Sequence, residues 1–136
     1  MKSFRLLFIC VLFMSSFTAS AQVYRFKTSS VSIMEKNDKG KWGEWSDFKK
    51  CELIITLDGK KDRIIVNTRE MQLYKIVSYM TTLEDEENKT VPFVCEDNAG
   101  GECTILIITR KKEDNRMQIY INYNDVKMVY NVYNSN

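Results

Sequence analysis

The chain has 136 residues, with 20 lysines and arginines against 18 aspartates and glutamates, and no histidine. Without histidine it has no imidazole general base, no Ser-His or Cys-His nucleophile pair and no histidine-ligated metal. A single proline and a hydrophobic content of 44% indicate a folded chain, and the length suits one domain.

Residues 1–21 have the pattern of a secretory signal peptide. Lys2 and Arg5 give the segment a positive start, a nearly apolar run follows, and a cleavage site of small residues ends at Ala21. The apolar run is about half the roughly 20 residues that a membrane-spanning helix needs, so we expect no stable membrane span. We therefore predict export to the periplasm or the extracellular space, with residues 22–136 as a single mature domain.

Cleavage after Ala21 leaves a chain of balanced charge. It removes Lys2 and Arg5 but no acidic residue, so 18 basic residues remain against 18 acidic residues. A neutral domain without a basic face has no general attraction to nucleic acid. We therefore expect no nucleic-acid partner.

Two short strand candidates, residues 23–28 and 31–35, precede a segment that contains both tryptophans. Trp42 and Trp45 flank Gly43. Their indole rings could stack on a sugar ring or an aromatic ligand. The alternative is structural, with one tryptophan in the core and the other lining a turn. Both residues are candidate contacts for a partner or ligand.

The tripeptide Gly43-Glu44-Trp45 matches the Gly-x-Trp pattern that opens lipocalin barrels. In these three residues the chain resembles the lipocalins, which are exported eight-stranded carriers of apolar ligands. The resemblance implies a β-barrel. It assigns no ligand-binding residue.

The middle of the chain predicts a hairpin followed by a further strand. Residues 51–57 and 63–68 are rich in β-branched residues and are joined by a loop of turn-forming residues. Residues 73–83 alternate weakly and contain tyrosine, valine, isoleucine and threonine, which favours a strand. Residues 69–76 could instead hold a helical turn.

Cys51, Cys95 and Cys103 remain after cleavage, and an exported protein meets oxidising conditions that favour a disulfide. Cys95 ends a strand candidate, residues 91–95, with Pro92 near its start, where a missing N–H donor is tolerated. A polar turn with two glycines separates Cys95 from Cys103, so the two can face each other on paired strands. We predict a Cys95–Cys103 disulfide. Cys51 is then either a buried thiol or an exposed thiol that pairs with another chain.

The clearest pattern lies at the C-terminus. In residues 116–123 and 126–133, every second side chain is apolar or aromatic, and Asn124-Asp125 between them tolerates the positive φ of a two-residue hairpin turn. Residues 104–110 form a further strand that reaches this hairpin through a short loop. The predicted cross-strand pairs are Tyr123 with Val126, Ile121 with Met128, Ile119 with Tyr130, and Met117 with Val132.

The elements are joined by short loops, and no connection is clearly a crossover helix, which favours an antiparallel sheet. We predict an all-β, single-domain antiparallel meander of about eight to nine strands. It closes into a small lipocalin-like barrel or folds into a sandwich.

The clustered carboxylates allow two interpretations, a Ca²⁺ site or a solvated acidic loop. The run Glu84-Asp85-Glu86-Glu87 and the nearby loop could hold Ca²⁺, but their spacing is not that of an EF-hand loop, and a solvated acidic loop explains them as well. Three cysteines without close spacing do not form a metal site. We therefore expect no metal and no cofactor.

A glycoside hydrolase would need two carboxyl groups about 5 to 9.5 Å apart, one of them with a raised pKa. None of the carboxylates lies in an evidently apolar stretch that would raise its pKa, so we expect no enzyme. The carboxylates that could converge in a cleft are Glu44, Asp47, Glu84, Asp97 and Glu102.

The outer face of the C-terminal hairpin combines Tyr120, Val129 and Tyr133. Tyrosine favours protein contact surfaces, so Tyr120 and Tyr133 are candidate partner contacts; the alternative is cross-strand aromatic packing. The last strand runs almost to the C-terminus and could be a sheet edge. An edge strand could pair with another chain, which would give a homodimer or a complex with an added strand.

The sequence thus favours a small exported, non-enzymatic protein that binds a protein or glycan. The alternative is a small-molecule carrier with a ligand inside a β-barrel, and the second alternative is a carboxylate-dependent glycoside hydrolase.

Overall fold

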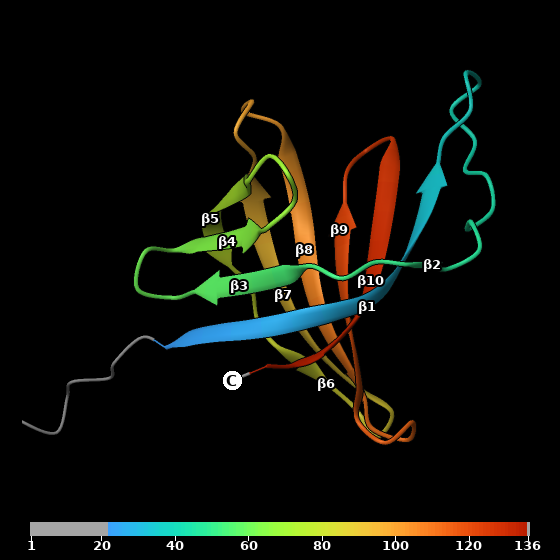
Figure 1. Ribbon diagram of the computed structural model, residues 1–136. Coiled ribbons are helices and arrows are strands. Elements are labelled where there is room, and N and C mark those ends of the chain that lie inside the picture. The colour runs from blue at the N-terminus through green and yellow to red at the C-terminus, as the bar shows by residue number, and fades with distance from the viewer. Residues whose placement is uncertain (1–21, 136) are drawn as a thin grey trace, which may run out of the picture.

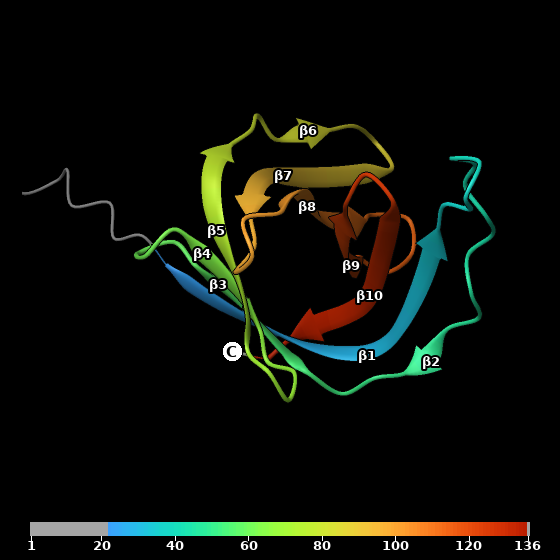
Figure 2. The same cartoon turned by 90° about the horizontal axis from the view of Figure 1, so that it is seen from above.

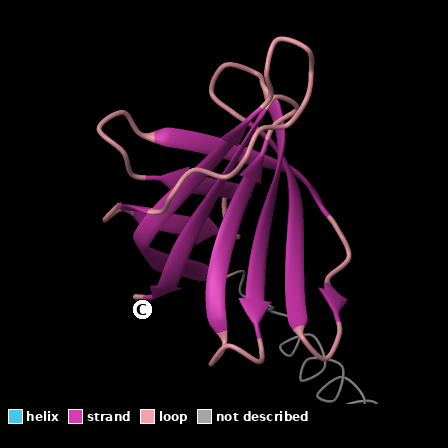
Figure 3. Ribbon diagram, turned by 90° about the vertical axis from the view of Figure 1, so that its right-hand side faces the viewer, coloured by secondary structure: helices cyan, strands magenta, loops and turns pink. Residues whose placement is uncertain are grey.

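The computed structural model describes residues 22–135, and Figure 3 shows strands and loops without a helix in this part of the chain. The predicted signal peptide, residues 1–21, lies outside the described residues. Within residues 22–135 there is accordingly no helix of the length and apolar character needed to cross a membrane. The strands are β1 (Val23–Glu35), β2 (Lys49–Lys50), β3 (Ile54–Asp58), β4 (Arg63–Val66), β5 (Gln72–Tyr79), β6 (Leu83–Glu84), β7 (Asn88–Glu96), β8 (Glu102–Arg110), β9 (Arg116–Asn122) and β10 (Val126–Asn134).

Eight of these strands form a closed antiparallel barrel. Each barrel strand pairs with the next one along the chain, in the order β1, β3, β4, β5, β7, β8, β9 and β10, and β10 pairs back to β1. Figure 2 shows this ring from above. The short strands β2 and β6 lie beside β1 and β7. The predicted all-β small barrel is confirmed, and the arrangement is not a sandwich.

The first strand is longer than the sequence pattern predicts. The two candidates, residues 23–28 and 31–35, form one strand, β1, with a register shift between Thr28 and Ser30. The first half of β1 pairs with β3 and a later part pairs with β2, while β10 runs along the other side. Such a shift bends a strand, and here it allows β1 to turn around the barrel.

The prediction that the last strand is a sheet edge is wrong. β10 pairs with β9 on one side and with β1 on the other, from Phe26 opposite Asn134 to Glu35 opposite Val126. A strand that is paired on both sides has no free backbone groups for another chain. The edge on which the homodimer or added-strand complex was predicted is therefore absent, because the first strand covers it.

The register of the C-terminal hairpin is confirmed. Ile121 lies opposite Met128 and Ile119 opposite Tyr130, as the alternation predicted. The turn differs in its backbone, since neither of its two central residues is among the positions with positive φ. The strand favoured for residues 73–83 is present as β5, which begins at Gln72, and the alternative of a helical turn in residues 69–76 is not formed.

Pro92 lies within β7 rather than near its start. Its carbonyl oxygen accepts a hydrogen bond of 3.2 Å from the Met80 N–H. β5 pairs with β7 from Phe93 onward, and β6 pairs with it only at residues 89–90. The N–H and C=O of one strand residue point to the same neighbour, so the donor that proline lacks falls in the gap between β5 and β6.

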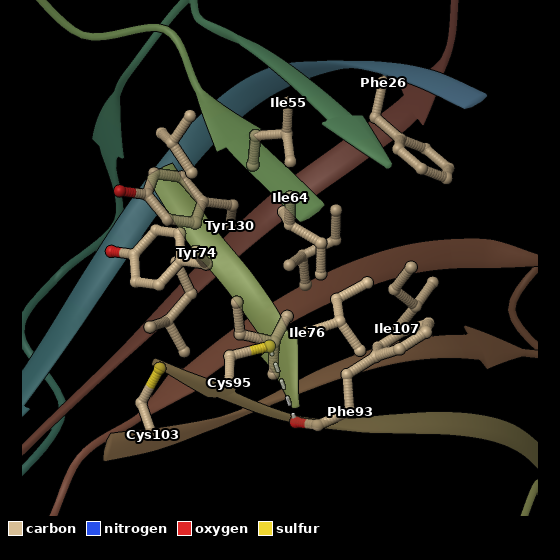
Figure 4. Close-up of a cluster of buried hydrophobic side chains, with 14 of the residues drawn as sticks. Phe26, Ile55, Ile64, Tyr74, Ile76, Phe93, Cys95, Cys103, Ile107 and Tyr130 are labelled. Atoms are coloured by element: carbon tan, nitrogen blue, oxygen red, sulfur yellow. Dashed lines mark hydrogen bonds between the residues drawn. The ribbon is translucent and has the colours of Figure 1, made fainter. Parts of the chain in front are cut away.

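Side chains fill the interior of the barrel. Figure 4 shows buried side chains from the surrounding strands packed against one another. An eight-stranded barrel has an interior just wide enough for such filling, and each buried aliphatic side chain stabilises the fold by about 1.5–3 kcal/mol. The most completely buried of these apolar side chains are Ile55, Ile64, Val66, Ile105, Ile119 and Ile121.

Cys95 and Cys103 lie directly opposite each other on β7 and β8, and both are buried in the interior. Their sulfur atoms are not bonded to each other in this structure, as Figure 4 shows, so the disulfide stays a prediction. Burial raises the pKa of the Cys95 thiol to about 12 and that of Cys103 to about 11, so the reduced thiols are protonated at neutral pH. Cys51 is half-buried and packs against the core.

Candidate functional site

A pocket of about 300 Å³ lies on the outside of the barrel, between β1, β8, β9, β10 and the segment that connects β1 to β2. Figure 2 shows that this segment runs outside the ring of strands, beside β1. We call this site the outer-wall pocket. Its lining residues are Ser32, Trp45, Phe48, Arg110, Arg116, Gln118, Tyr120 and Val129.

The outer-wall pocket brings together two of the four predicted contact residues, Trp45 and Tyr120. Their rings meet edge to face, with centroids 6.1 Å apart and planes at 80°. Trp45 remains 40% exposed, and the neighbouring Phe48 remains 49% exposed. Large aromatic surfaces that stay open to solvent beside a pocket are available to contact a ligand or a partner.

Hydrogen bonds to β1 hold Trp45 in place through its neighbour Ser46. The Ser46 N–H donates to the Ile33 carbonyl oxygen at 2.8 Å, and the Ile33 N–H donates to Ser46 Oγ at 2.9 Å. The hydroxyl of Ser32, which is fully buried, donates to the Ser46 carbonyl oxygen at 2.6 Å. These three bonds fix the backbone next to Trp45 against a barrel strand.

The Gly43-Glu44-Trp45 tripeptide lies in no strand, and the barrel begins before it, with β1. The tripeptide therefore does not open the barrel in this chain. The Gly43 N–H donates to the Glu35 carbonyl oxygen at 2.8 Å, and a Cβ atom at position 43 would lie only 3.2 Å from that oxygen. Glycine thus allows the segment to run close to the end of β1, two residues before Trp45.

The side chains of Arg110 and Gln118 form the floor of the pocket, and Arg110 anchors it. Its Nε donates to Gln118 Oε1 at 3.2 Å, its Nη1 to Asn88 Oδ1 at 3.1 Å and its Nη2 to Tyr120 Oη at 3.4 Å. Gln118 is 5% exposed. The Arg110 side chain therefore links the outer faces of β7, β8 and β9 and holds the Tyr120 ring from its hydroxyl end.

A second set of hydrogen bonds extends the floor to β10 and β1. Gln118 Nε2 donates to Asn131 Oδ1 at 3.0 Å, and Arg116 Nη1 donates to the same oxygen at 2.9 Å. Asn131 Nδ2 donates to Ser30 Oγ at 2.9 Å. A polar network whose members are each hydrogen-bonded across neighbouring strands is rigid, so the floor is preorganised.

The outer-wall pocket has a positive charge. Arg116 pairs with Glu113 at 3.1 Å, but within residues 22–135 no carboxylate lies at ion-pair distance from Arg110. The hydrogen-bond acceptors of Arg110 are all neutral. The site can therefore hold a ligand that combines a polar or anionic group with a flat surface.

The other two predicted contact residues lie elsewhere. The Trp42 ring has the ammonium groups of Lys36 and Lys127 at 4.9 and 4.6 Å from its centroid, which gives it an intramolecular role. Tyr133 lines a separate pocket of about 500 Å³ around Lys27 and Thr28. That pocket is larger than the outer-wall pocket, but Tyr133 is 53% exposed and has no ring contact or hydrogen bond with another described side chain.

A further pocket of about 470 Å³ lies at one end of the barrel, and we call it the mouth pocket. Tyr123 Oη donates to Asp97 Oδ2 at 2.8 Å there, and Tyr74 also lines it. Burial, followed by the hydrogen bond to Asp97, raises the pKa of Tyr123, and burial raises that of Tyr74. The hydrogen bond from Tyr123 and those from the Gly101 and Ala99 N–H groups lower the pKa of Asp97.

The acidic run has structural partners. Glu84 forms an ion pair of 2.7 Å with Lys111, which lowers the pKa of Glu84. Hydrogen bonds from the N–H groups of Asn88 and Glu87 lower the pKa of Asp85. A glycosidase general acid needs a raised pKa, whereas the pKa values of Glu84 and Asp97 are lowered. Across residues 22–135, no three potential histidine, cysteine or carboxylate ligands cluster as a metal site would require.

Sequence reasoning did not identify Arg110, Phe48 or Gln118 as site residues. Gln118 was placed on the outer face by the alternation of β9, and Arg110 shares its face through the pairing of β8 with β9. Phe48 reaches the site only because its segment folds back along β1. In comparisons with known proteins, no protein-family model matches this chain, and neither a curated protein nor a solved structure matches it.

Proposed function

We propose that this chain is an exported, non-enzymatic binding protein that captures a protein or glycan partner at the outer-wall pocket. The observation that carries the proposal is the position of Trp45, Phe48 and Tyr120 around a floor cross-linked by Arg110 and Gln118. Exposed aromatic side chains supply large contact area at low cost in conformational entropy. A preorganised floor further reduces the entropy lost on binding.

The proposal is tested by comparing matched variants on an array of glycans and peptides. Trp45→Ala removes a wall of the pocket, so we expect loss of the signals that the wild-type protein gives. Trp42→Ala is the control, because Trp42 lies three residues away and contacts two lysines instead of the pocket. Equal signals from the wild type and the Trp45→Ala variant would contradict the proposal.

The non-enzymatic part of the proposal has a separate measurement. A partner identified on the array is incubated with the protein, and its mass is recorded before and after. We expect the mass to be unchanged, because none of the residues that line the outer-wall pocket is a carboxylate, a histidine or a cysteine. A cleaved or modified partner would contradict this part.

A second candidate is a carrier that holds a small molecule at the mouth pocket, favoured by the two tyrosines Tyr74 and Tyr123 at a barrel end. Packing of the interior confines such a ligand to the mouth. Native mass spectrometry of the protein purified from the exported fraction of its own host tests this candidate. An added mass of a few hundred daltons that is lost on denaturation would support the carrier, and a bare chain would count against it.

A further inference from the structure

The donors of Arg110 are only partly used. A guanidinium group has five N–H donors. Three of them bond to Gln118, Asn88 and Tyr120, and the remaining two have no partner within residues 22–135. The guanidinium lines the outer-wall pocket, so these two donors are available to a ligand that enters it.

A carboxylate is the group that best matches these donors. Arginine offers a planar fork of N–H groups that a carboxylate can accept with both oxygens, and such charge-assisted hydrogen bonds are roughly twice as strong as neutral ones. Because no carboxylate of residues 22–135 pairs with Arg110, a ligand carboxylate would meet an unneutralised charge.

The rest of the lining indicates what carries this carboxylate. Polar and apolar side chains contribute in equal number, with Ser32, Arg116 and Gln118 beside Arg110 on the polar side. The other polar side chains of the lining already have partners, since Ser32 donates to Ser46, Gln118 to Asn131, and Arg116 to Asn131 and Glu113, so the two donors of Arg110 are the ones left for a ligand. A sugar ring that has a carboxylate offers this group to Arg110 and a flat face to an aromatic ring such as Trp45.

We infer that the outer-wall pocket binds an acidic sugar of the uronic acid type, with its carboxylate on Arg110 and its ring against Trp45. The inference rests on the proposed function, since it names the ligand class of the same pocket. The pocket volume of about 300 Å³ suits a single sugar unit of a longer saccharide.

Isothermal titration calorimetry with two matched sugars tests the inference. Methyl glucuronide and methyl glucoside differ in the carboxylate that replaces a hydroxymethyl group. We expect the glucuronide to bind at least about tenfold more tightly, since hydrogen bonds to a charged group are stronger than those between neutral groups. The difference should shrink when the salt concentration rises, because salt screens the charge.

Two variants separate the carboxylate contact from the rest of the site. Arg110→Gln should remove the difference between the two sugars, and Arg69→Gln, which changes an arginine of the mouth pocket, should leave it intact. Trp45→Ala should weaken both sugars by the same factor and keep their ratio, because Trp45 is expected to contact the ring and not the carboxylate. Circular dichroism checks that each variant is folded.

Any of three other outcomes would overturn the inference. Equal affinity for the two sugars, with weaker binding of both by the Trp45→Ala variant, would exclude the contact between a carboxylate and Arg110. It would leave the proposed function intact. Tighter binding of N-acetylphenylalanine than of methyl glucuronide assigns the site to a peptide carboxylate instead. If neither sugar binds at millimolar concentration, the uronic acid is excluded, and the array experiment decides separately whether the pocket binds another partner.

Discussion

The inner and outer faces of β8, β9 and β10 are built from alternate residues of the same strands, yet they differ in kind. The inner face has fully buried isoleucines, among them Ile105, Ile119 and Ile121. The outer face has Arg110 and Gln118, joined to each other and to neighbouring strands by directed hydrogen bonds.

The two faces therefore differ in role: the inner face stabilises the barrel, and the outer face is the one proposed to bind a partner. Apolar packing is non-directional, so the inner face stabilises the barrel and can accept no ligand without losing its own contacts. The hydrogen bonds of the outer face are directional and hold aromatic rings in fixed positions beside solvent. A change inside should therefore lower stability, and a change outside should alter binding with little loss of stability.

The largest expected effect comes from the interior. Ile121→Ala should lower the free energy of unfolding by about 2–5 kcal/mol, because it leaves a cavity in a packed core. Urea denaturation measures the loss. Leu106→Ala is the matched control, since Leu106 is half-buried on the outer face of β8, and its loss should be smaller. Equal losses at the two positions would contradict the assignment of the two faces.

The predicted disulfide gives the next effect. If Cys95 and Cys103 are bonded in the protein purified from its host, reduction should lower its stability by about 2–3 kcal/mol, because the closed loop is short. Thermal unfolding with and without reductant measures this change, and the Cys95→Ser variant should not respond to reductant. An unchanged unfolding midpoint of the wild type on reduction would contradict the predicted disulfide.

Alkaline pH should destabilise the fold through a buried tyrosine of the interior. Burial raises the pKa of Tyr130 from 10.0 to about 12. Between these pH values the unfolded chain releases the proton while the folded chain keeps it, so the stability present below pH 10 is lost as the pH rises towards 12. Unfolding midpoints measured from pH 8 to pH 11 should fall, and the fall should be shallower for Tyr130→Phe. The same slope in both proteins would contradict the burial of this hydroxyl.

A smaller effect on stability and a larger one on binding are expected for Ser46→Ala. The substitution removes the oxygen that accepts from the Ile33 N–H, at a cost of about 1 kcal/mol, and it loosens the wall that holds Trp45. Binding of the array partner should weaken, whereas Ser78→Ala, on an exposed part of β5, should have no effect. Undiminished binding by Ser46→Ala would show that the wall does not contribute.

The smallest effect is expected at Tyr133. Tyr133→Ala should change the stability by less than about 0.5 kcal/mol and leave binding unchanged, because this side chain is exposed and lies outside the outer-wall pocket. Tyr120→Ala should weaken binding, since Tyr120 forms the edge-to-face contact with Trp45. A loss of binding on Tyr133→Ala with none on Tyr120→Ala would move the contact surface to the other pocket.

The sequence predicts the parts of the fold that depend on local pattern. The register of β9 and β10 follows from strict alternation and is confirmed at Ile119 and Ile121, although the turn between the strands lacks the expected positive φ. The continuity of β1 across Ser29 did not follow, because a register shift interrupts the alternation there. The closure of β10 on β1 did not follow either, since it joins residues about a hundred positions apart, as Figure 1 makes visible.

In the candidate site, too, sequence reasoning identified some residues and missed others. Trp45 and Tyr120 were selected by residue type, because aromatic side chains on exposed positions favour recognition. Their contact with each other could not be predicted, since it requires the segment after β1 to fold back along that strand through Ser46. Arg110 was missed because an arginine at a strand end is usually solvated, and its hydrogen bonds to Gln118, Asn88 and Tyr120 on the neighbouring strands distinguish it only in the structure.

The most direct test of the difference between the two faces is a map of backbone amide shifts by nuclear magnetic resonance, recorded while methyl glucuronide or the array partner is added. The account predicts that the largest shifts occur at residues 45–48 and at Arg110, Gln118 and Tyr120, with small shifts around the mouth pocket. Largest shifts at Tyr74, Asp97 and Tyr123 would place the ligand at the barrel end and contradict the outer-wall site.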